Sequence, residues 1–371
     1  MTVEGETRVV VVVVGGGYGG VNVAKALDAD ARLDIVLVEP KDAFVHTVAT
    51  LRALVEPAFL PTIFLPYDRM LTYGRVVRER AVQVDAHRVT LASGAELRAD
   101  YIVLATGSRY PFPAKSNADA IADALGQYRV AHEALSRAEH ALLIGAGAVG
   151  IELAGEITSK WPGKHVTLLD SADDLMGGDF RPELRAELRR QLLERGVDLR
   201  LGQRLRELPK APPATFGKVS TVTASGEEIA ADIWFRCFGV DPISDYLGAS
   251  LAYARRPDGF IAVEPTLQLA GHPNVFAIGD AADADAKMAG RAGRQAHLVA
   301  DNIRKLVAGE PDLARYEPIP PAIVLPIGPD GGSGQLPGTD ELMATEVVAQ
   351  IKGRDLMVGR YAEILGVASA G

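Results

Sequence analysis

The hydrophobic pattern of this chain occurs twice, and each copy predicts the same succession of elements. Val9–Val14 is a run of six valines that leads into a glycine-rich stretch, and Ala141–Ile144 is an apolar run that leads into another. A short continuous apolar run bounded by glycines is typical of a strand buried on both faces of a parallel sheet. A helical pattern follows each glycine-rich stretch. The patterning therefore predicts two βαβ units.

Both glycine-rich stretches fit the spacing Gly-x-Gly-x-x-Gly. In this motif the first glycine permits a tight turn, the second lets a pyrophosphate approach the backbone, and the third lets the helix pack on the strand. The positive end of the helix then faces the phosphates. The residues concerned are Gly15, Gly17, Tyr18, Gly19 and Gly20 in the first copy, and Gly145, Gly147, Val149 and Gly150 in the second.

An acidic residue follows each motif at the spacing that a dinucleotide site requires. Glu39 ends the apolar run 35–38, and Asp170 ends the run 166–169. An acid about 20 residues after the last glycine accepts hydrogen bonds from ribose hydroxyls. Because no arginine follows Asp170 closely to neutralise a 2′-phosphate, the sequence predicts a preference for NADH over NADPH, with NADPH still possible.

The repetition continues beyond the two motifs. Residues 93, 100 and 107 (Ser, Asp and Gly) recur 132 positions later as Ser225, Asp232 and Gly239. Each half thus predicts a βαβ unit, a hairpin with a Ser-Gly turn and a buried strand that ends in glycine.

The remaining apolar patterns extend this plan. Asn274–Ala277 predicts a strand that meets Gly279 and Asp280, where the aspartate could cap the next helix, contact a ligand, or do both. In residues 182–193 the apolar positions 184, 188 and 192 predict a packed surface helix. Met343, Val347 and Ile351 recur every four residues, and we expect this apolar side to pack on the first domain.

These patterns predict an α/β fold with two Rossmann-like dinucleotide-binding domains, the second inserted in the first, and a small C-terminal α+β domain. We expect the first dinucleotide-binding domain to comprise residues 1–113 and 239–308, the second 114–238, and the C-terminal domain 309–371, where prolines become frequent.

Composition and charge exclude several functions. The net charge of −9 provides no basic field for nucleic acid. The single cysteine, Cys237, lies in an apolar strand pattern and cannot form a disulfide within the chain. The seven histidines show no metal-ligand spacing, so no metal site is expected. The N-terminal residues lack a signal-peptide pattern, and residue 2 is Thr and not Gly, so we expect neither a secretory leader nor N-myristoylation.

The motifs at 15–20, 105–108, 150–157 and 277–280 resemble those of the pyridine nucleotide–disulfide oxidoreductases, the two-dinucleotide flavoproteins. The segments 41–46, 287–289 and 352–356 are more specific and resemble the branch of ferroptosis-suppressor and apoptosis-inducing-factor-like proteins, to which type II NADH dehydrogenases are related. The resemblance covers nearly the whole chain. One departure is Thr2, which stands where the animal members carry a lipidated glycine.

The resemblance implies FAD in the first domain and NAD(P)H in the second. It implies tuning or positioning roles for Lys287, His46 and Glu152. It also implies cofactor contacts for the two glycine-rich turns with Glu39 and Asp170, and for Pro40, Lys41, Arg52, Val82, Ala105, Thr106, Gly107, Gly239, Gly279, Asp280, Met288 and Ala289.

The expected activity is hydride transfer from NADH to FAD and electron delivery to a small acceptor such as a quinone, in chemistry that belongs to the cofactors. The alternatives are a ferredoxin or rubredoxin reductase and a redox-sensing flavoprotein that oxidises NADH slowly. We expect a cytoplasmic protein with at most weak peripheral contact with the inner face of a membrane; a homodimer is possible. Lys287 could also be an ordinary surface lysine.

Overall fold

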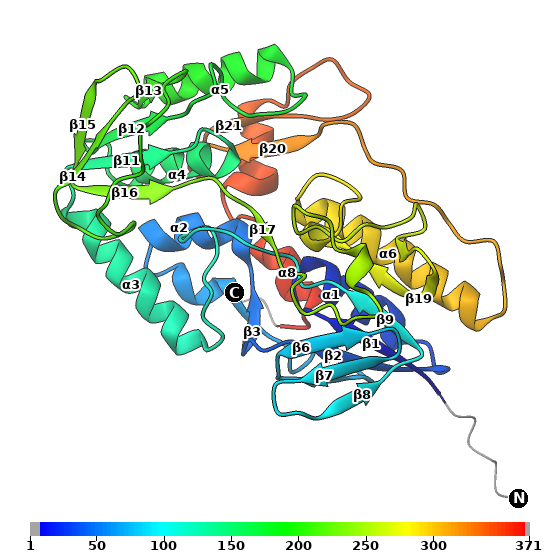
Figure 1. Ribbon diagram of the computed structural model, residues 1–371. Coiled ribbons are helices and arrows are strands. Elements are labelled where there is room, and N and C mark those ends of the chain that lie inside the picture. The colour runs from blue at the N-terminus through cyan, green and yellow to red at the C-terminus, as the bar shows by residue number, and fades with distance from the viewer. Residues whose placement is uncertain (1–7, 368–371) are drawn as a thin grey trace, which may run out of the picture.

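Two parallel sheets, each covered by helices, form the core of the molecule (Figure 1). The computed structural model describes residues 8–367. The expectations about a leader segment and about Thr2 concern residues 1–7, which lie outside the described residues, as do residues 368–371. The predicted α/β fold with two Rossmann-like domains is confirmed.

The first sheet is built from two distant parts of the chain. Its order is β18-β19-β9-β1-β2-β5, and only the edge strand β18 runs antiparallel to its neighbour. The valine run is β1, in the middle of the sheet, and its residues 11–13 are fully buried, as the pattern predicts. The strands are β1 (Val9–Val14), β2 (Leu33–Val38), β5 (Arg75–Val77), β9 (Tyr101–Leu104), β18 (Gln268–Leu269) and β19 (His272–Ala277).

The second sheet repeats the first on a smaller scale. Its order is β13-β12-β11-β16, and all pairs are parallel. The strands are β11 (His140–Ile144), β12 (His165–Leu169), β13 (Asp198–Arg200) and β16 (Ile233–Arg236). Val14 pairs with Leu104 in the first sheet, and Ile144 pairs with Arg236 in the second, so the two repeats share one register.

Helices cover both sheets. They are α1 (Tyr18–Asp28), α2 (Thr50–Val55), α3 (Ile121–Arg137), α4 (Ala148–Lys160), α5 (Pro182–Glu194) and α6 (Ala289–Val307). The predicted surface helix is α5, in which Leu184, Leu188 and Leu192 are fully buried. Short 3₁₀ helices occur at Thr47–Ala49, Leu60–Ile63, Ala252–Ala254 and Gly279–Ala281.

Small antiparallel pieces complete the two halves. The two predicted Ser-Gly turns join β7 (Arg88–Leu91) to β8 (Glu96–Arg98) and β14 (Val219–Val222) to β15 (Glu228–Ala231), with Gly94 and Gly226 at positive φ. The others are β3 (Ala43–Val45) with β4 (Phe64–Pro66), β6 (Ala81–Asp85) with β7, and β10 (Ser108–Arg109) with β17 (Asp241–Pro242). The β10–β17 pair lies where the chain crosses between the two sheets.

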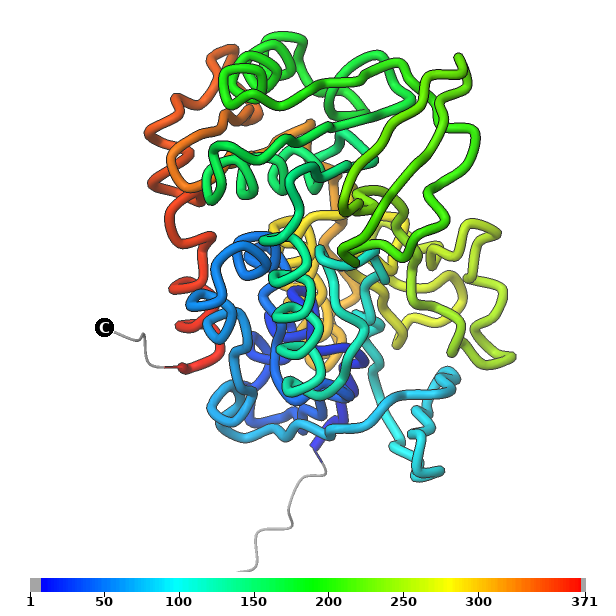
Figure 2. The backbone as a smooth tube through the Cα atoms, turned by 90° about the vertical axis from the view of Figure 1, so that its left-hand side faces the viewer, coloured from blue at the N-terminus to red at the C-terminus, as the bar shows by residue number. Residues whose placement is uncertain are grey.

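The C-terminal segment runs along the second half of the molecule and ends against the first (Figure 2). It comprises β20 (Ile323–Pro326), β21 (Gly332–Gln335), α7 (Thr345–Val348), a π-helical turn at Ala349–Gly353 and α8 (Val358–Ile364). Tyr361 of α8 packs its ring 4.9 Å from that of Tyr18 and 5.6 Å from that of Phe44.

The expected packing of the apolar side at 343, 347 and 351 on the first domain is wrong, because Met343 lies against Gly334 of β21 and the other two side chains are largely exposed. Val347 and Ile351 are 40% and 46% exposed, whereas Val348, Ala349 and Gly353 are buried. A four-residue spacing follows one face only along a continuous α-helix, and here α7 gives way to the π turn after four residues. The buried side packs beside β20 and β21, and a Cβ on Gly353 would lie 2.4 Å from the carbonyl oxygen of Pro329.

Candidate functional site

The first glycine-rich turn forms an open cradle at the start of α1. Gly15 has a φ of +105°, and a Cβ on Gly20 would lie 1.8 Å from the carbonyl oxygen of Gly15, so both positions require glycine. At Gly17, in contrast, a Cβ would meet no described atom within 4 Å. Protein packing therefore does not explain Gly17, whereas the backbone approach of a pyrophosphate does. A Cβ on Gly19 would lie 3.0 Å from Ile278, at the contact between α1 and the end of β19.

Glu39 is buried and directed at this cradle. One carboxylate oxygen accepts the backbone N–H of Gly16 at 2.6 Å, and the other accepts that of Lys41 at 3.0 Å. Burial raises the pKa of Glu39, and these hydrogen bonds oppose the shift. Pro40 and Lys41 continue the loop, and the Lys41 ammonium donates to the carbonyl of Ala118. The acid thus lies where the ribose of a dinucleotide bound to the turn would be.

The second glycine-rich turn reproduces the first in detail. Gly145 has a φ of +113°, a Cβ on Gly150 would lie 1.9 Å from the carbonyl oxygen of Gly145, and one on Gly147 would meet no described atom within 4 Å. Asp170 accepts the backbone N–H of Ala146 at 2.6 Å and that of Ala172 at 2.9 Å. Val149 lies in the first turn of α4. Each turn therefore fits one dinucleotide.

Asp280 lies in the 3₁₀ helix Gly279–Ala281, which follows β19. Its carboxylate accepts Ser108 Oγ at 2.7 Å and the ammonium of Lys115 at 3.1 Å. The expectation that it could cap the next helix is wrong, because the N-cap of α6 is Met288. Gly279 has a φ of +71° and donates its N–H to Gln295. Sequence reasoning missed Lys115, which lies in no motif and reaches Asp280 only through the fold.

The other predicted cofactor residues lie at several places, and of these Ala105 and Thr106 lie against Gly15 of the first turn. Ala105 and Thr106 follow β9, and Thr106 Oγ donates to the carbonyl of Ile243 at 2.6 Å. Gly107 and Gly239, the equivalent glycines of the two repeats, both have positive φ. Ala289 begins α6. Val82 lies in β6 beside a bulge and is 48% exposed.

His46 is fully buried between the first helix and the C-terminal segment. Its Nδ1 is 3.1 Å from the hydroxyl of Tyr18, and its Nε2 is 2.7 Å from the carbonyl oxygen of Leu356. Burial lowers the pKa of His46 to about 4, so the ring is neutral at pH 7. A neutral ring that donates from Nε2 and accepts at Nδ1 satisfies both contacts.

The contact with His46 supports a strained turn. Leu356 and Met357 have φ angles of 53° and 64°, a region that non-glycine residues rarely occupy. His46 and the carboxylate of Asp355, which accepts the N–H of Met357, hold this turn. This turn is the local structure at the end of the segment 352–356.

Glu152 and Arg52 both form ion pairs near the second turn. The carboxylate of Glu152 accepts the ammonium of Lys352 at 2.8 Å. Arg52 forms a buried pair with Glu156, one helical turn further along α4, and also donates to the carbonyl of Gly353 at 3.0 Å. Burial raises the pKa of Glu156 against the effect of Arg52. The sequence predicted cofactor contacts for Arg52 and Glu152 but not these partners, which come from elements distant in the chain.

Lys287 is half-buried, so it is not an ordinary surface lysine. Its ammonium donates to the carbonyls of Ala282 and Asp285 at 2.6 and 2.8 Å and lies 4.4 Å from the ring centroid of Phe260. Burial lowers its pKa, and Asp280 and the neighbouring aspartates oppose the shift. The cation is therefore held by the loop that leads from Asp280 to α6.

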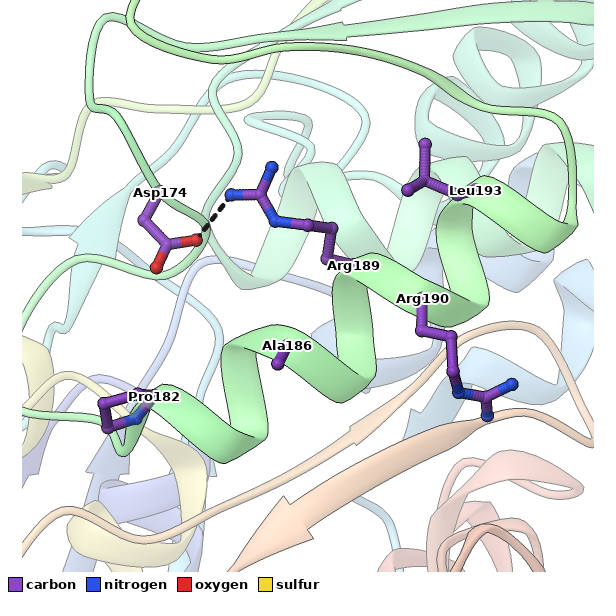
Figure 3. Close-up of a pocket in the computed structure, with 6 residues that line it drawn as sticks. All are labelled: Asp174, Pro182, Ala186, Arg189, Arg190 and Leu193. Atoms are coloured by element: carbon purple, nitrogen blue, oxygen red, sulfur yellow. Dashed lines mark hydrogen bonds and ion pairs between the residues drawn. The ribbon is translucent and has the colours of Figure 1, made fainter.

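A separate pocket lies on the outer side of α5 (Figure 3). Figure 3 shows Arg189 directed at Asp174, with which it pairs at 2.9 Å, while Arg190 points away. Arg185 also approaches Asp174, at 3.9 Å. Arg185 and Arg189 thus lie close to the loop that follows Asp170, although no arginine follows Asp170 closely in the sequence. Both of these arginines already pair with Asp174.

The fold and the two cradles define the class: a protein with two dinucleotide-binding Rossmann-like domains. The family model described as "Pyridine nucleotide-disulphide oxidoreductase" matches residues 9–299, and the chain belongs to this family. It is an FAD-dependent oxidoreductase that uses a pyridine nucleotide. Although the family name refers to a disulfide, which needs two cysteines, this chain contains only Cys237. Burial raises the pKa of the Cys237 thiol to about 12.

Named relatives support this assignment, and a solved structure supports the fold. The chain is 35% identical to ferroptosis suppressor protein 1 of Taeniopygia guttata, over 99% of this chain and 98% of the relative. It is 34% identical to the protein of the same name from Homo sapiens, over 94% and 93%. The fold is similar to that of the sulfide:quinone oxidoreductase from Aquifex aeolicus, with a TM-score of 0.78, 18% identity, and coverage of 96% of this chain and 91% of that one. None of the helices in residues 8–367 combines the length and apolar character that crossing a bilayer requires.

Proposed function

We propose that this protein oxidises NADH, in preference to NADPH, and passes the electrons to a small diffusible acceptor of the quinone type. When bound, FAD would supply the redox chemistry by taking a hydride and releasing its electrons singly or in pairs. The residues of the first turn with Glu39 and Asp280 would hold this group, and those of the second turn with Asp170 would hold the nicotinamide nucleotide.

The observation that carries the proposal is the paired arrangement of turn and acid. Each of Glu39 and Asp170 is bound to the N–H of the second residue of its turn, at the same distance of 2.6 Å. The carboxylate near each ribose accepts hydrogen bonds from hydroxyl groups, whereas a 2′-phosphate there would meet a like charge. The geometry at Asp170 therefore supports NADH.

The single thiol of the protein limits how electrons can leave the flavin. Electrons that pass through a disulfide need two cysteines, and the full chain has only Cys237, which is buried in the second sheet. Electrons therefore cannot leave the flavin through a disulfide within the chain. The resemblance of the 352–356 segment to the ferroptosis-suppressor branch favours a quinone as the acceptor. Leu336, Val347 and Ile351 expose apolar side chains on the C-terminal segment and support at most a weak, reversible contact with a membrane surface.

The experiment is anaerobic reduction of the FAD-loaded protein with NADH, followed by rapid mixing with a ubiquinone analogue, a menaquinone analogue or ferredoxin. We expect fast bleaching of the flavin absorbance and fastest reoxidation by a quinone. Faster reoxidation by ferredoxin would show a ferredoxin reductase instead. Very slow bleaching, with no acceptor that restores the colour, would favour a redox-sensing role and would refute the proposal.

A further inference from the structure

The two repeats differ at one position beside their glycine-rich turns. In the first sheet, Leu104 ends β9 and pairs with Val14, the residue before Gly15. In the second sheet, Arg236 ends β16 and pairs with Ile144, the residue before Gly145. The second repeat therefore places a cation where the first places a buried leucine. Because the strand pairing at this position is the same in both repeats, the comparison indicates that the pairing itself does not require a cation there.

Arg236 lacks the partners that other shielded arginines have. It is partly buried, and its Nε is buried without a hydrogen-bond acceptor among the described residues. Its guanidinium lies over the ring of Phe238, 4.6 Å from the centroid, and forms no ion pair within residues 8–367. Arg52 and Arg291, in contrast, pair with Glu156 and Asp285. The Nε of Arg236 is shielded without an acceptor, and no anion lies beside the guanidinium among the described residues, so this position suits an anion that arrives with a ligand.

The position of Arg236 indicates which anion that is. Phe238 adjoins the second turn, since a Cβ on Gly145 would lie 3.3 Å from the Cβ of Phe238. The strand order β12-β11-β16 places Asp170 and Arg236 on opposite sides of β11. The acid thus lies on the adenosine-ribose side of the turn, and the cation lies on the side from which the rest of the dinucleotide leaves. A 2′-phosphate would be on the side away from Arg236.

We propose that Arg236 binds the pyrophosphate of the pyridine nucleotide and is a binding residue particular to the second repeat. This inference rests on the proposed use of the second turn for NADH. A guanidinium presents several donors in a fixed fork and suits phosphate oxygens. The cation adds to the N–H groups of the turn and of the start of α4, which also face a pyrophosphate.

The test measures binding rather than turnover. FAD-loaded, oxidised wild type and Arg236→Leu, which restores the residue of the first repeat, are titrated with ADP-ribose by calorimetry. Adenosine, which lacks the pyrophosphate, is titrated by saturation-transfer NMR. We expect Arg236→Leu to weaken ADP-ribose binding roughly tenfold or more, in line with a charge-assisted hydrogen bond. Adenosine binding should not change, and raising the salt concentration should weaken ADP-ribose binding less in the variant than in wild type.

A matched control comes from the same domain. Arg137 also lies over a phenylalanine ring, that of Phe216, at 4.3 Å from the centroid, but it is exposed at the end of α3. Arg137→Leu should leave ADP-ribose binding at the wild-type level. If it weakens binding as much as Arg236→Leu does, the effect belongs to the general charge of the domain, and the inference is wrong.

Thermal melting separates binding from a structural role. Without nucleotide, Arg236→Leu should melt at or above the wild-type temperature, because leucine replaces a group with an unpartnered nitrogen. A large decrease would indicate a structural role. If that variant does not fold, the neutral Arg236→Gln replaces it and should show the same loss of ADP-ribose affinity.

Wild-type affinity in a folded neutral variant would overturn the inference even if NADH oxidation stands. If wild type binds ADP-ribose but NADH does not bleach the flavin, the proposed function fails and the role of Arg236 does not.

Discussion

At the scale of single residues, two glycines are not required by packing in the structure, and we propose that a bound ligand requires them. Gly17 and Gly147 are the second glycines of their motifs, and neither would bring a Cβ near a described atom. Gly15, Gly20 and their counterparts are needed by the backbone itself. The same motif therefore contains positions whose substitution should have different consequences.

We expect Gly17→Val to yield a folded protein without flavin, because the side chain fills the space of the pyrophosphate and little else. Gly147→Val should retain the yellow colour but lose reduction by NADH, while dithionite still bleaches the flavin. Absorbance spectra and far-UV circular dichroism check both outcomes. Gly20→Val is the contrasting variant and should fail to fold, since its Cβ would lie 1.8 Å from a carbonyl oxygen. Full flavin content in Gly17→Val would contradict the assignment of the first turn.

Asp170 should set the choice between NADH and NADPH. We expect wild type to favour NADH at least tenfold in kcat/KM, which requires about 1.4 kcal/mol. Asp170→Asn removes the charge but keeps an oxygen that can accept the N–H of Ala146. The preference should therefore shrink mainly through better use of NADPH. Steady-state kinetics with both nucleotides provide the measurement, and equal kcat/KM values in wild type would be evidence against the proposed preference.

At the scale of elements, the last described helix, α8, packs on the first, α1. His46, after β3, holds the Leu356 turn, and Tyr361 of α8 packs on Tyr18 of α1. Lys25 of α1 also donates to the carbonyl of Ile364 at 2.6 Å. The aromatic and hydrogen-bonded contacts thus couple the C-terminal segment to the FAD-binding part.

The buried neutral His46 should make this contact sensitive to acid. Its pKa is 6.5 when unfolded and is lowered to about 4 in the folded protein. Its contribution to stability is therefore complete above pH 6.5 and is lost as the pH falls toward 4, by about 2 kcal/mol at pH 5. Urea denaturation at pH 7 and pH 5 should show a larger loss in wild type than in His46→Gln, which does not titrate. The same loss in both proteins would mean that His46 does not titrate as described.

The exposed side of α7 and the π turn provides a test of the acceptor site. Val347→Glu and Ile351→Glu should not affect folding, because both side chains are largely exposed. If this surface lies beside the acceptor entrance, as the resemblance implies, the double variant should lower turnover of long-chain quinones more than that of short water-soluble ones. Flavin reduction by NADH, measured in a stopped-flow experiment, serves as the control. Unchanged turnover of all quinones would place the entrance elsewhere.

At the scale of the whole molecule, the repeated pattern was sufficient to predict the fold. Parallel strands buried on both faces leave a strong sequence signal, and the glycine motifs and acids have fixed local spacing. The domain boundaries and the cofactor contacts of individual residues stay predictions. The partners of Glu152, Arg52 and Asp280 could not be read from the sequence, because Lys352, Glu156 and Lys115 reach them only through tertiary packing. The packing predicted from the spacing at 343–351 was wrong because a π turn interrupts the helix.

The insertion of one sheet within the other has a consequence for how the protein is made. The smaller sheet has all its strands once the ribosome has passed Arg236, whereas the larger sheet still lacks β18 and β19. Nascent domains fold as units as their residues emerge. The sheet that begins later in the chain can therefore assemble first, while β9 keeps an open edge until β19 is made. Such an unpaired edge is prone to association with other chains, so chaperone binding during synthesis should concentrate before residue 277 emerges.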